Sequence, residues 1–335
     1  MTFSFVPSAL SATMVALACL ATTAQAQAPA NGSVALPAAA NNPASVTAPQ
    51  VVAHYAHLVH SNYSDTLAAA KAMQTAISAF TSQPSAATLA EARKTWLAAR
   101  EFYGQTEAFR FYGGPIDNDN GPEGRINAWP MDESFVDSVQ GKASAGLVNN
   151  RKFVINKKNL YAQNERGGEE NIATGWHAIE FFLWGQDLLE TGPGERNFED
   201  FVDGKAPNAD RRRQYLNVVT ELLIDDLTSL VKAWAPDAKN NYRARFVKGN
   251  RESLRKMLVG LGSLSRGELA GERLEVALNS QDQEDEHSCF SDNTHRDAVT
   301  NAKGIQNVWL GKYQQADGTV LMGPSLRDLV AAKDA

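Results

Sequence analysis

One imidazole and one carboxylate stand three residues apart in a segment that is otherwise almost entirely apolar. They are His177 and Glu180, in the segment that runs from Gly175 to Gly185. Residues three apart on a helix share a face, so the two side chains would lie next to each other. A neutral imidazole beside an ionised carboxylate, with bulky neighbours excluding water, can supply part of a binding site for iron, zinc or copper.

The simpler interpretation is that His177 and Glu180 only hydrogen-bond to each other. Their neighbours make the predicted helix apolar nearly all round, and such a helix is buried. Burying a polar pair without further compensation costs free energy. We therefore favour metal binding and keep the purely structural pair as the alternative.

The N-terminal segment has the features of an export signal. Residues 1–64 contain no charged side chain, and the short apolar run 14–21 is followed by Ala24-Gln25-Ala26, a signal-peptidase type of site. We expect a signal peptide at residues 1–26 and a mature protein in the periplasm or cell envelope. Lipidation at Cys19 is not expected, because Ala16 occupies the position where a lipobox has Leu.

Charge, hydropathy and cysteine content argue against nucleic-acid and membrane partners, a membrane span and an internal disulfide. The predicted mature chain keeps the formal net charge of −6, which argues against nucleic acid or an anionic membrane as the main partner. No other apolar run reaches the ~18 residues that a membrane span requires. Only Cys289 remains after cleavage, so no internal disulfide can form.

The remaining chain has the pattern of an all-α protein. Residues 27–49 have the composition of a disordered tether. Beyond it, apolar residues recur three and four apart, Ser85 is placed to cap a helix, and no segment alternates as a strand would. The helices that we predict span residues 51–80, 86–111, 169–189, 210–233, 241–266 and 267–278.

The predicted helices group into two halves of one domain. This domain spans residues 50–330, with subdomains at about 51–190 and 210–330. Each half has a pair of long helices followed by a helix that begins at a glycine and ends in Gln-Asp. We therefore predict two helical bundles related by approximate internal symmetry.

Further metal ligands would have to come from other helices. Glu107 is the first choice, because it is polar among Phe102, Phe109 and Phe111; its alternative is an ion pair with Arg110 or Arg100. Asp117 is a weaker candidate, since it follows a Gly-Gly-Pro break and fits turn chemistry.

A downstream block is also rich in side chains that bind soft and borderline metals. His287, Cys289, Asp292 and His295 fall within nine residues. We regard His287, Cys289 and His295 as weaker ligand candidates, because a lone Cys is usually a small buried hydrophobic residue.

Several blocks together resemble the imelysin-like family, also called peptidase M75, which includes iron-regulated protein A. The segment Gly175-Trp-His-Ala-Ile-Glu180 looks like its GxHxxE signature. Other similar blocks are Trp96, Arg100 and residues 103–111, residues 121–130, and residues 284–295.

The resemblance implies two α-helical bundle subdomains, export to the periplasm or outer surface, and a role in iron acquisition. The implied cofactor is a metal ion, with iron first and zinc or copper as alternatives. An envelope transport protein is a possible partner class. No phosphate-binding glycine loop or Cys-x-x-Cys haem attachment is present.

The peptidase label that comes with this family is not supported by the local sequence. A zincin helix has H-E-x-x-H, but residue 178 is Ala, and the inverted motif needs His where Phe181 stands. We therefore assign no catalytic residue. A metallopeptidase remains one alternative, and an envelope protein that docks a partner or a ligand such as haem remains another.

Overall fold

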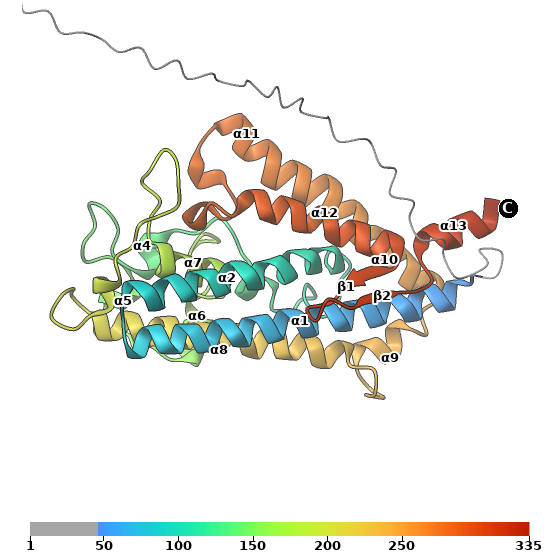
Figure 1. Cartoon of the computed structure of the whole chain (residues 1–335), viewed down its shortest axis with the longest axis horizontal. Coiled ribbons are helices and arrows are strands. Elements are labelled where there is room, and N and C mark those ends of the chain that lie inside the picture. The colour runs from blue at the N-terminus through green and yellow to red at the C-terminus, as the bar shows by residue number, and fades with distance from the viewer. Residues whose placement is uncertain (1–45, 335) are drawn as a thin grey trace, which may run out of the picture. The chain divides into compact units, whose positions relative to one another are not determined.

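A long helical hairpin and a third long helix form the base of the molecule. The computed structural model describes residues 46–334, which belong to one compact unit. Helix α1 packs against both α2 and α8 (Figure 1). Their bounds are Ala48–Ser82 for α1, Ala86–Thr106 for α2 and Ala209–Trp234 for α8.

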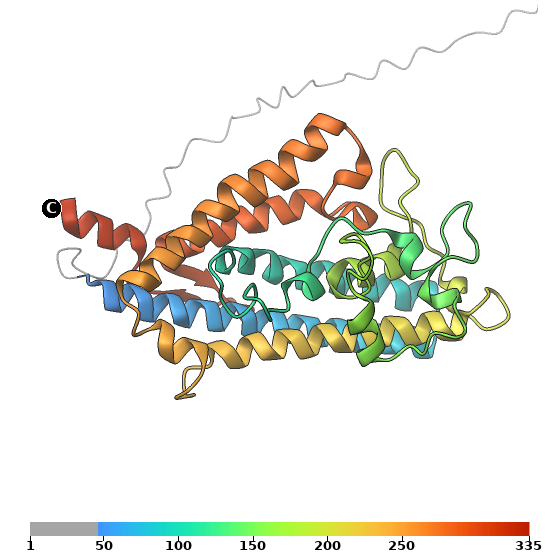
Figure 2. The ribbon, with the colours of Figure 1, turned by 180° about the vertical axis from the view of Figure 1, so that it is seen from behind.

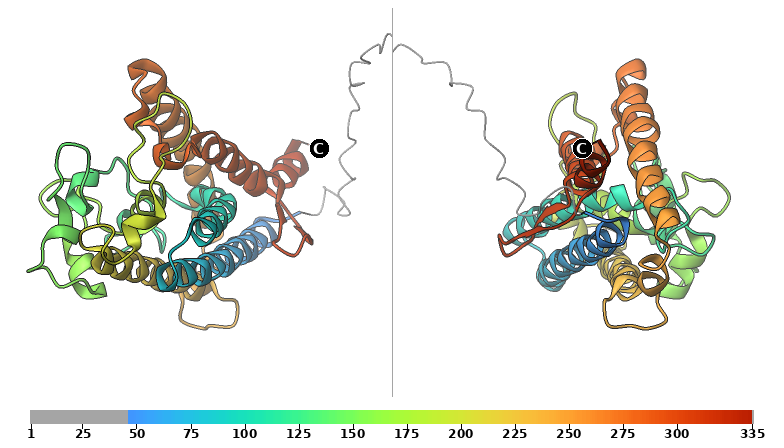
Figure 3. Two further views of the ribbon diagram at one scale, coloured as in Figure 1. Left: turned by 60° about the vertical axis from the view of Figure 1, so that its left-hand side comes forward. Right: turned by 90° about the vertical axis from the view of Figure 1, so that its right-hand side faces the viewer.

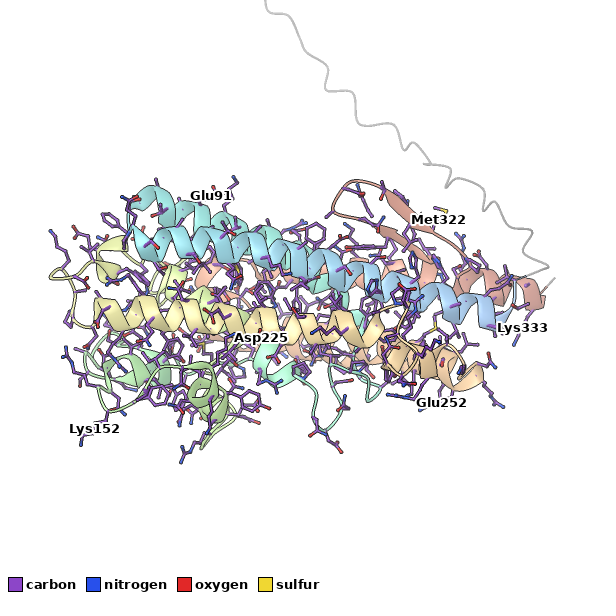
Figure 4. All side chains as sticks on the ribbon, turned by 90° about the horizontal axis from the view of Figure 1, so that it is seen from below. Glu91, Lys152, Asp225, Glu252, Met322 and Lys333 are labelled. Carbon is purple, nitrogen blue, oxygen red and sulfur yellow. The ribbon has the colours of Figure 1, made fainter. Side chains whose placement is uncertain are left out.

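The apolar periodicity of α1 explains this packing. One face of the helix is buried at three- and four-residue intervals, the spacing that puts side chains on one stripe: Val59, Tyr63, Thr66, Ala70, Met73, Ile77 and Phe80. Seen from below, α1 and α8 run side by side, whereas the labelled Glu91 and Lys152 lie at the periphery (Figure 4).

Short helices and loops follow α2 and cover one end of the base, as the view from behind shows (Figure 2). The buried helix α7, Gly175–Trp184, contacts α2 and α8 from this region. The other short elements here are α3 (Glu123–Ile126), α4 (Glu133–Val136), α5 (Gly146–Asn149), α6 (Lys157–Gln163) and η3 (Phe198–Phe201). The short helix η2 (Glu107–Phe109) continues α2 and contacts α10 and α12.

The C-terminal part packs over α2. Helix α12, Thr294–Leu310, lies along α2, and the run from α10 to α11 extends beside α12 (Figure 3). The other elements are α9 (Tyr242–Phe246), α10 (Arg251–Gly262), η4 (Ser263–Glu275), α11 (Val276–Ser280), η5 (Gln283–Asp285), η6 (Cys289–Ser291) and α13 (Leu326–Asp334).

The all-α prediction is confirmed, with one small exception. Strands β1 (Lys312–Gln314) and β2 (Val320–Met322) form an antiparallel hairpin in which Tyr313 pairs with Leu321. Three-residue strands are too short for an alternating pattern to be recognised in the sequence.

Some helix boundaries differ from the prediction. Helix α7 covers only the centre of the predicted 169–189 segment. The predicted helix 241–266 is interrupted between Phe246, where α9 ends, and Arg251, where α10 begins. From Arg251 onward, α10, η4 and α11 form one continuous run through Gly267, in which η4 is a π-helix of 13 residues. A π-helix places residues five apart on one face, and Glu268 and Arg273 are ion-paired at 3.0 Å on that face.

Other predictions on chain organisation stay predictions. The signal peptide and nearly all of the tether lie outside the described residues, and α1 begins at Ala48, within the predicted tether. The two symmetric subdomains stay a prediction. Within residues 46–334, no helix is both long and apolar enough to cross a membrane.

Candidate metal centre

Helix α7 holds the His177–Glu180 pair in a fixed and fully buried position. It begins at Gly175, which has a φ of +88°, and it ends before Gly185, which has a φ of +77°. The hydroxyl of Thr174 donates to the Arg125 carbonyl at 3.0 Å, which ties the start of α7 to α3. All ten residues of the helix are buried.

Replacing Gly175 with Ala is expected to destabilise the fold by about 2 kcal/mol. An added Cβ would lie 2.5 Å from the Ile126 carbonyl oxygen, in addition to the strain of a positive φ. Gly192→Ala is the matched control, because Gly192 has a φ of +94° but no atom near its Cβ position. Urea unfolding measures both variants. An equal loss in the two would show that the contact with Ile126 contributes nothing.

In the His177–Glu180 pair the carboxyl group of Glu180 is fully hydrogen-bonded, whereas one ring nitrogen of His177 is not. The Nδ1 atom of His177 lies 2.9 Å from Oε2 of Glu180. Oε1 of Glu180 accepts hydrogen bonds from the Ser291 amide at 3.0 Å and the Ser291 hydroxyl at 2.6 Å. Both carboxylate oxygens are therefore engaged. Nε2 of His177 is buried and has no hydrogen-bond partner among the described residues.

His287 has a similar environment. Its Nδ1 atom lies 2.7 Å from Oδ2 of Asp297, which also accepts from the Ser288 hydroxyl at 2.6 Å. Asp297 forms a buried ion pair with Arg100 at 2.9 Å. Each histidine thus directs Nδ1 to a carboxylate and keeps Nε2 for another interaction.

The two imidazoles lie against each other. Their ring centroids are 4.7 Å apart with an interplanar angle of 81°, and the Trp129 ring lies 4.8 Å from that of His177. The Asn127 amide nitrogen is 3.4 Å from Nε2 of His287, and the Asn127 oxygen accepts from Arg100 at 2.6 Å. With this assignment of the Asn127 amide, the lone pair on Nε2 of His287 accepts the hydrogen bond from the Asn127 nitrogen.

The electrostatics keep both imidazoles neutral. Burial, together with the proximity of His287 and the charge of Arg100, holds the pKa of His177 well below its ordinary value. Burial and the charge of Arg273 lower the pKa of His287 to about 4. Burial raises the pKa of Glu180 to about 8, against the opposing effect of its bonds from Ser291. Neutral imidazole is the form that binds metals.

Glu107 belongs to a neighbouring ion-pair cluster. Its Oε2 atom lies 2.5 Å from Nη1 of Arg110 and 2.8 Å from Nη2 of Arg273. Burial would raise the pKa of Glu107, but these two guanidinium groups lower it to about 2. No hydrogen bond joins Glu107 to His177 or Glu180 in the described region, and its role as a ligand stays a prediction.

The weaker ligand candidates lie in three different environments. Cys289 is buried, and burial raises the pKa of its thiol far above the usual range. Asp117 accepts from the Tyr112 and Gly114 amides within a turn. His295 is exposed and its Nδ1 lies 3.1 Å from the Asp292 carbonyl oxygen.

Of the predicted ligands, the structure brings together His177, Glu180 and His287. No group of three or more His, Cys, Asp or Glu side chains is arranged to hold a metal ion among residues 46–334. An ion held here would therefore complete its coordination with water or with a ligand that it carries.

Sequence reasoning missed the residues that orient this site. Asp297 and Ser291 were not singled out, although both lie in or next to the downstream block. Arg100 was noted as part of a family-like block and as an alternative partner of Glu107, but not as a partner of Asp297. The local sequence gives no signal that Arg100 meets Asp297, because 197 positions separate them.

Comparisons with known proteins agree with the fold. The chain is 27% identical over 266 residues to iron-regulated protein A of Synechococcus elongatus, across 77% of this chain and 62% of that protein. The chain thus spans less than two thirds of that relative. A crystal structure of a putative iron-regulated protein A precursor from Parabacteroides distasonis superposes with a TM-score of 0.60 at 20% identity, covering 79% of this chain and 73% of the other.

The decisive match is to a family model rather than to a single relative. The model of the family described as Imelysin, Peptidase M75, matches residues 59–335, which is most of the chain and contains every residue of the site described above. This protein belongs to the imelysin family.

Proposed function

We propose that this protein captures iron, or a similar cation, in the cell envelope, at a site built on His177 and His287. The observation that carries the proposal is the unpartnered Nε2 of His177, which is buried beside a second neutral imidazole. A buried polar atom without a partner is costly, and a bound ion would remove that cost.

The orientation of both rings supports this proposal. Histidines that bind metals usually donate the other ring N–H to a carboxylate, which fixes the tautomer. Asp297 has this position for His287, at 2.7 Å from Nδ1. Glu180 has it for His177, at 2.9 Å from Nδ1, once its carboxyl group is ionised, and a bound cation favours that ionised form. In this arrangement Glu180 orients His177 rather than binding the ion directly. A site that combines imidazole nitrogen with water or another ligand carried by the ion suits iron, zinc or copper.

The iron assignment and the envelope location have further support. The solved relative from Parabacteroides is described as an iron-regulated protein precursor, and the curated relative is also named as iron-regulated. The predicted signal peptide of this chain agrees with export. A role in iron acquisition follows from these points together.

The test is metal analysis of the purified protein. The chain is prepared without chelator and titrated anaerobically with Fe²⁺ and Zn²⁺, beside His177→Ala, His287→Ala and the control His295→Ala. We expect equimolar metal in the wild type and in the control, and loss of metal in the other two. Circular dichroism establishes that each variant is folded. Retention of metal by folded His177→Ala would reject the proposed site.

A further inference from the structure

A cavity of about 530 Å³ opens next to His287 and has an excess of carboxylates. Its walls also include Arg110 and Arg273, so six acidic groups against two guanidinium groups give a formal net charge of −4. The acidic residues come from α3, the loop between α6 and α7, η4 and η5, and they are Glu123, Glu165, Glu169, Glu268, Glu272 and Asp285.

The two guanidinium groups are already neutralised. Arg110 pairs with Glu107 and Glu123, and Arg273 pairs with Glu107 and Glu268. Within the described part of the chain, the remaining four wall carboxylates make no ion pair: Glu165, Glu169, Glu272 and Asp285. The negative charge of the cavity is therefore not balanced by neighbouring side chains.

The cavity leads to the imidazole pair, which is an independent indication of a ligand. His287 is only 4% exposed, and it forms part of the cavity wall. The ring of His177 lies 4.7 Å behind it, and Nε2 of His177 has no partner. An acidic surface alone would indicate nothing, but this one adjoins buried nitrogen atoms that can bind a cation.

We infer that this cavity is the entrance to the site and that the protein takes its cation as an aquated divalent ion rather than as an anionic chelate. The inference rests on the function proposed above and specifies its substrate class. A concave surface of one charge concentrates ions of the opposite charge and speeds their association. The same field repels an anionic complex such as ferric citrate.

The size of the cavity fits this class of substrate. Six water molecules at about 30 Å³ each occupy roughly 180 Å³, which is well below the cavity volume of about 530 Å³. An ion can thus enter with its first hydration shell and exchange water for imidazole at the inner end. Two neutral imidazoles are ligands that suit divalent iron or zinc.

The experiment compares association rates in two variants that lose the same charge. The entrance variant is Glu165→Gln/Glu169→Gln/Glu272→Gln. The control removes three exposed acidic groups outside the cavity, as Glu91→Gln/Asp210→Asn/Asp237→Asn. Stopped-flow mixing with Zn²⁺ measures association at low and high salt. We expect association of the entrance variant to be roughly tenfold slower at low salt, with the difference shrinking at high salt.

Dissociation of Zn²⁺ should be the same in all three proteins, and ferric citrate should not compete with Zn²⁺ for the wild type. If the control slows as much as the entrance variant, or if ferric citrate competes, the inference is overturned while the proposed site stands. Wild-type protein that binds neither Zn²⁺ nor Fe²⁺ overturns both. If His177→Ala loses its metal but the entrance variant associates with Zn²⁺ as fast as the wild type, the entrance is rejected and the proposed site stands.

Discussion

Replacing Asp297 with Asn is expected to lower the free energy of unfolding by about 3–5 kcal/mol, because it leaves the buried Arg100 without a counter-charge. Arg100 and Asp297 are 2% and 1% exposed. Burial would raise the pKa of Asp297, but Arg100 and the bond to His287 hold it well below its ordinary range. Urea unfolding at neutral pH measures the loss.

The same substitution should weaken cation binding by about 10–100-fold, because Asp297 fixes the tautomer of His287. Asp137→Asn is the matched control. Asp137 is fully buried and pairs with Arg196 and Arg212, and it has no contact with the imidazole pair. Both variants should lose stability, and only Asp297→Asn should lose cation affinity.

A double variant separates the charge from the contact. The Arg100 guanidinium is surrounded by the rings of Trp96, Tyr103 and Trp176 at 5.3–5.8 Å. Adding Arg100→Met to Asp297→Asn removes the unpaired charge and leaves an apolar side chain among these rings. Much of the lost stability should return. If Asp297→Asn alone unfolds like the wild type, the ion pair is not a structural determinant of this core.

The helices of the base could be predicted from the sequence because their signals are local. The bounds of α1, α2 and α8 follow the apolar periodicity to within a few residues, and Ser85 caps α2 by accepting from the Thr88 amide at 3.2 Å. The π-helix η4 was not predicted. Its geometry places Arg273 against Glu107, a residue from a distant part of the chain. Tertiary contacts of this kind leave no periodic signal.

In the candidate site, too, one part could be predicted from local sequence and another part depends on tertiary packing. His177 and Glu180 are three residues apart, so their contact could be predicted from helix geometry alone. The pairing of His287 with Asp297, and the approach of His287 to His177, depend on how η6 and α12 pack on α7 and α2. Residue types suggested His287 as a ligand, but only the fold identifies Asp297 as its orienting carboxylate.

Glu107→Gln is expected to destabilise the protein by about 3 kcal/mol at neutral pH, because it removes a carboxylate that two buried guanidinium groups share. Glu107 is 1% exposed and contacts Arg110 and Arg273. The cost stays at the lower end of the usual range, since Glu123 still pairs with Arg110 and Glu268 with Arg273.

The pH dependence of this difference has a definite sign. The folded protein lowers the pKa of Glu107 from 4.5 to about 2. A carboxyl group with a depressed pKa stabilises the folded state above its unfolded pKa, and this contribution is lost as the pH falls toward the folded value. The gap between wild type and Glu107→Gln should therefore be constant above about pH 5. It should close between about pH 4.5 and pH 2. Urea unfolding of both proteins across this range is the measurement. A gap that widened on acidification would mean that Glu107 is not ionised in the folded protein, and that its pairing with Arg110 and Arg273 does not stabilise this core.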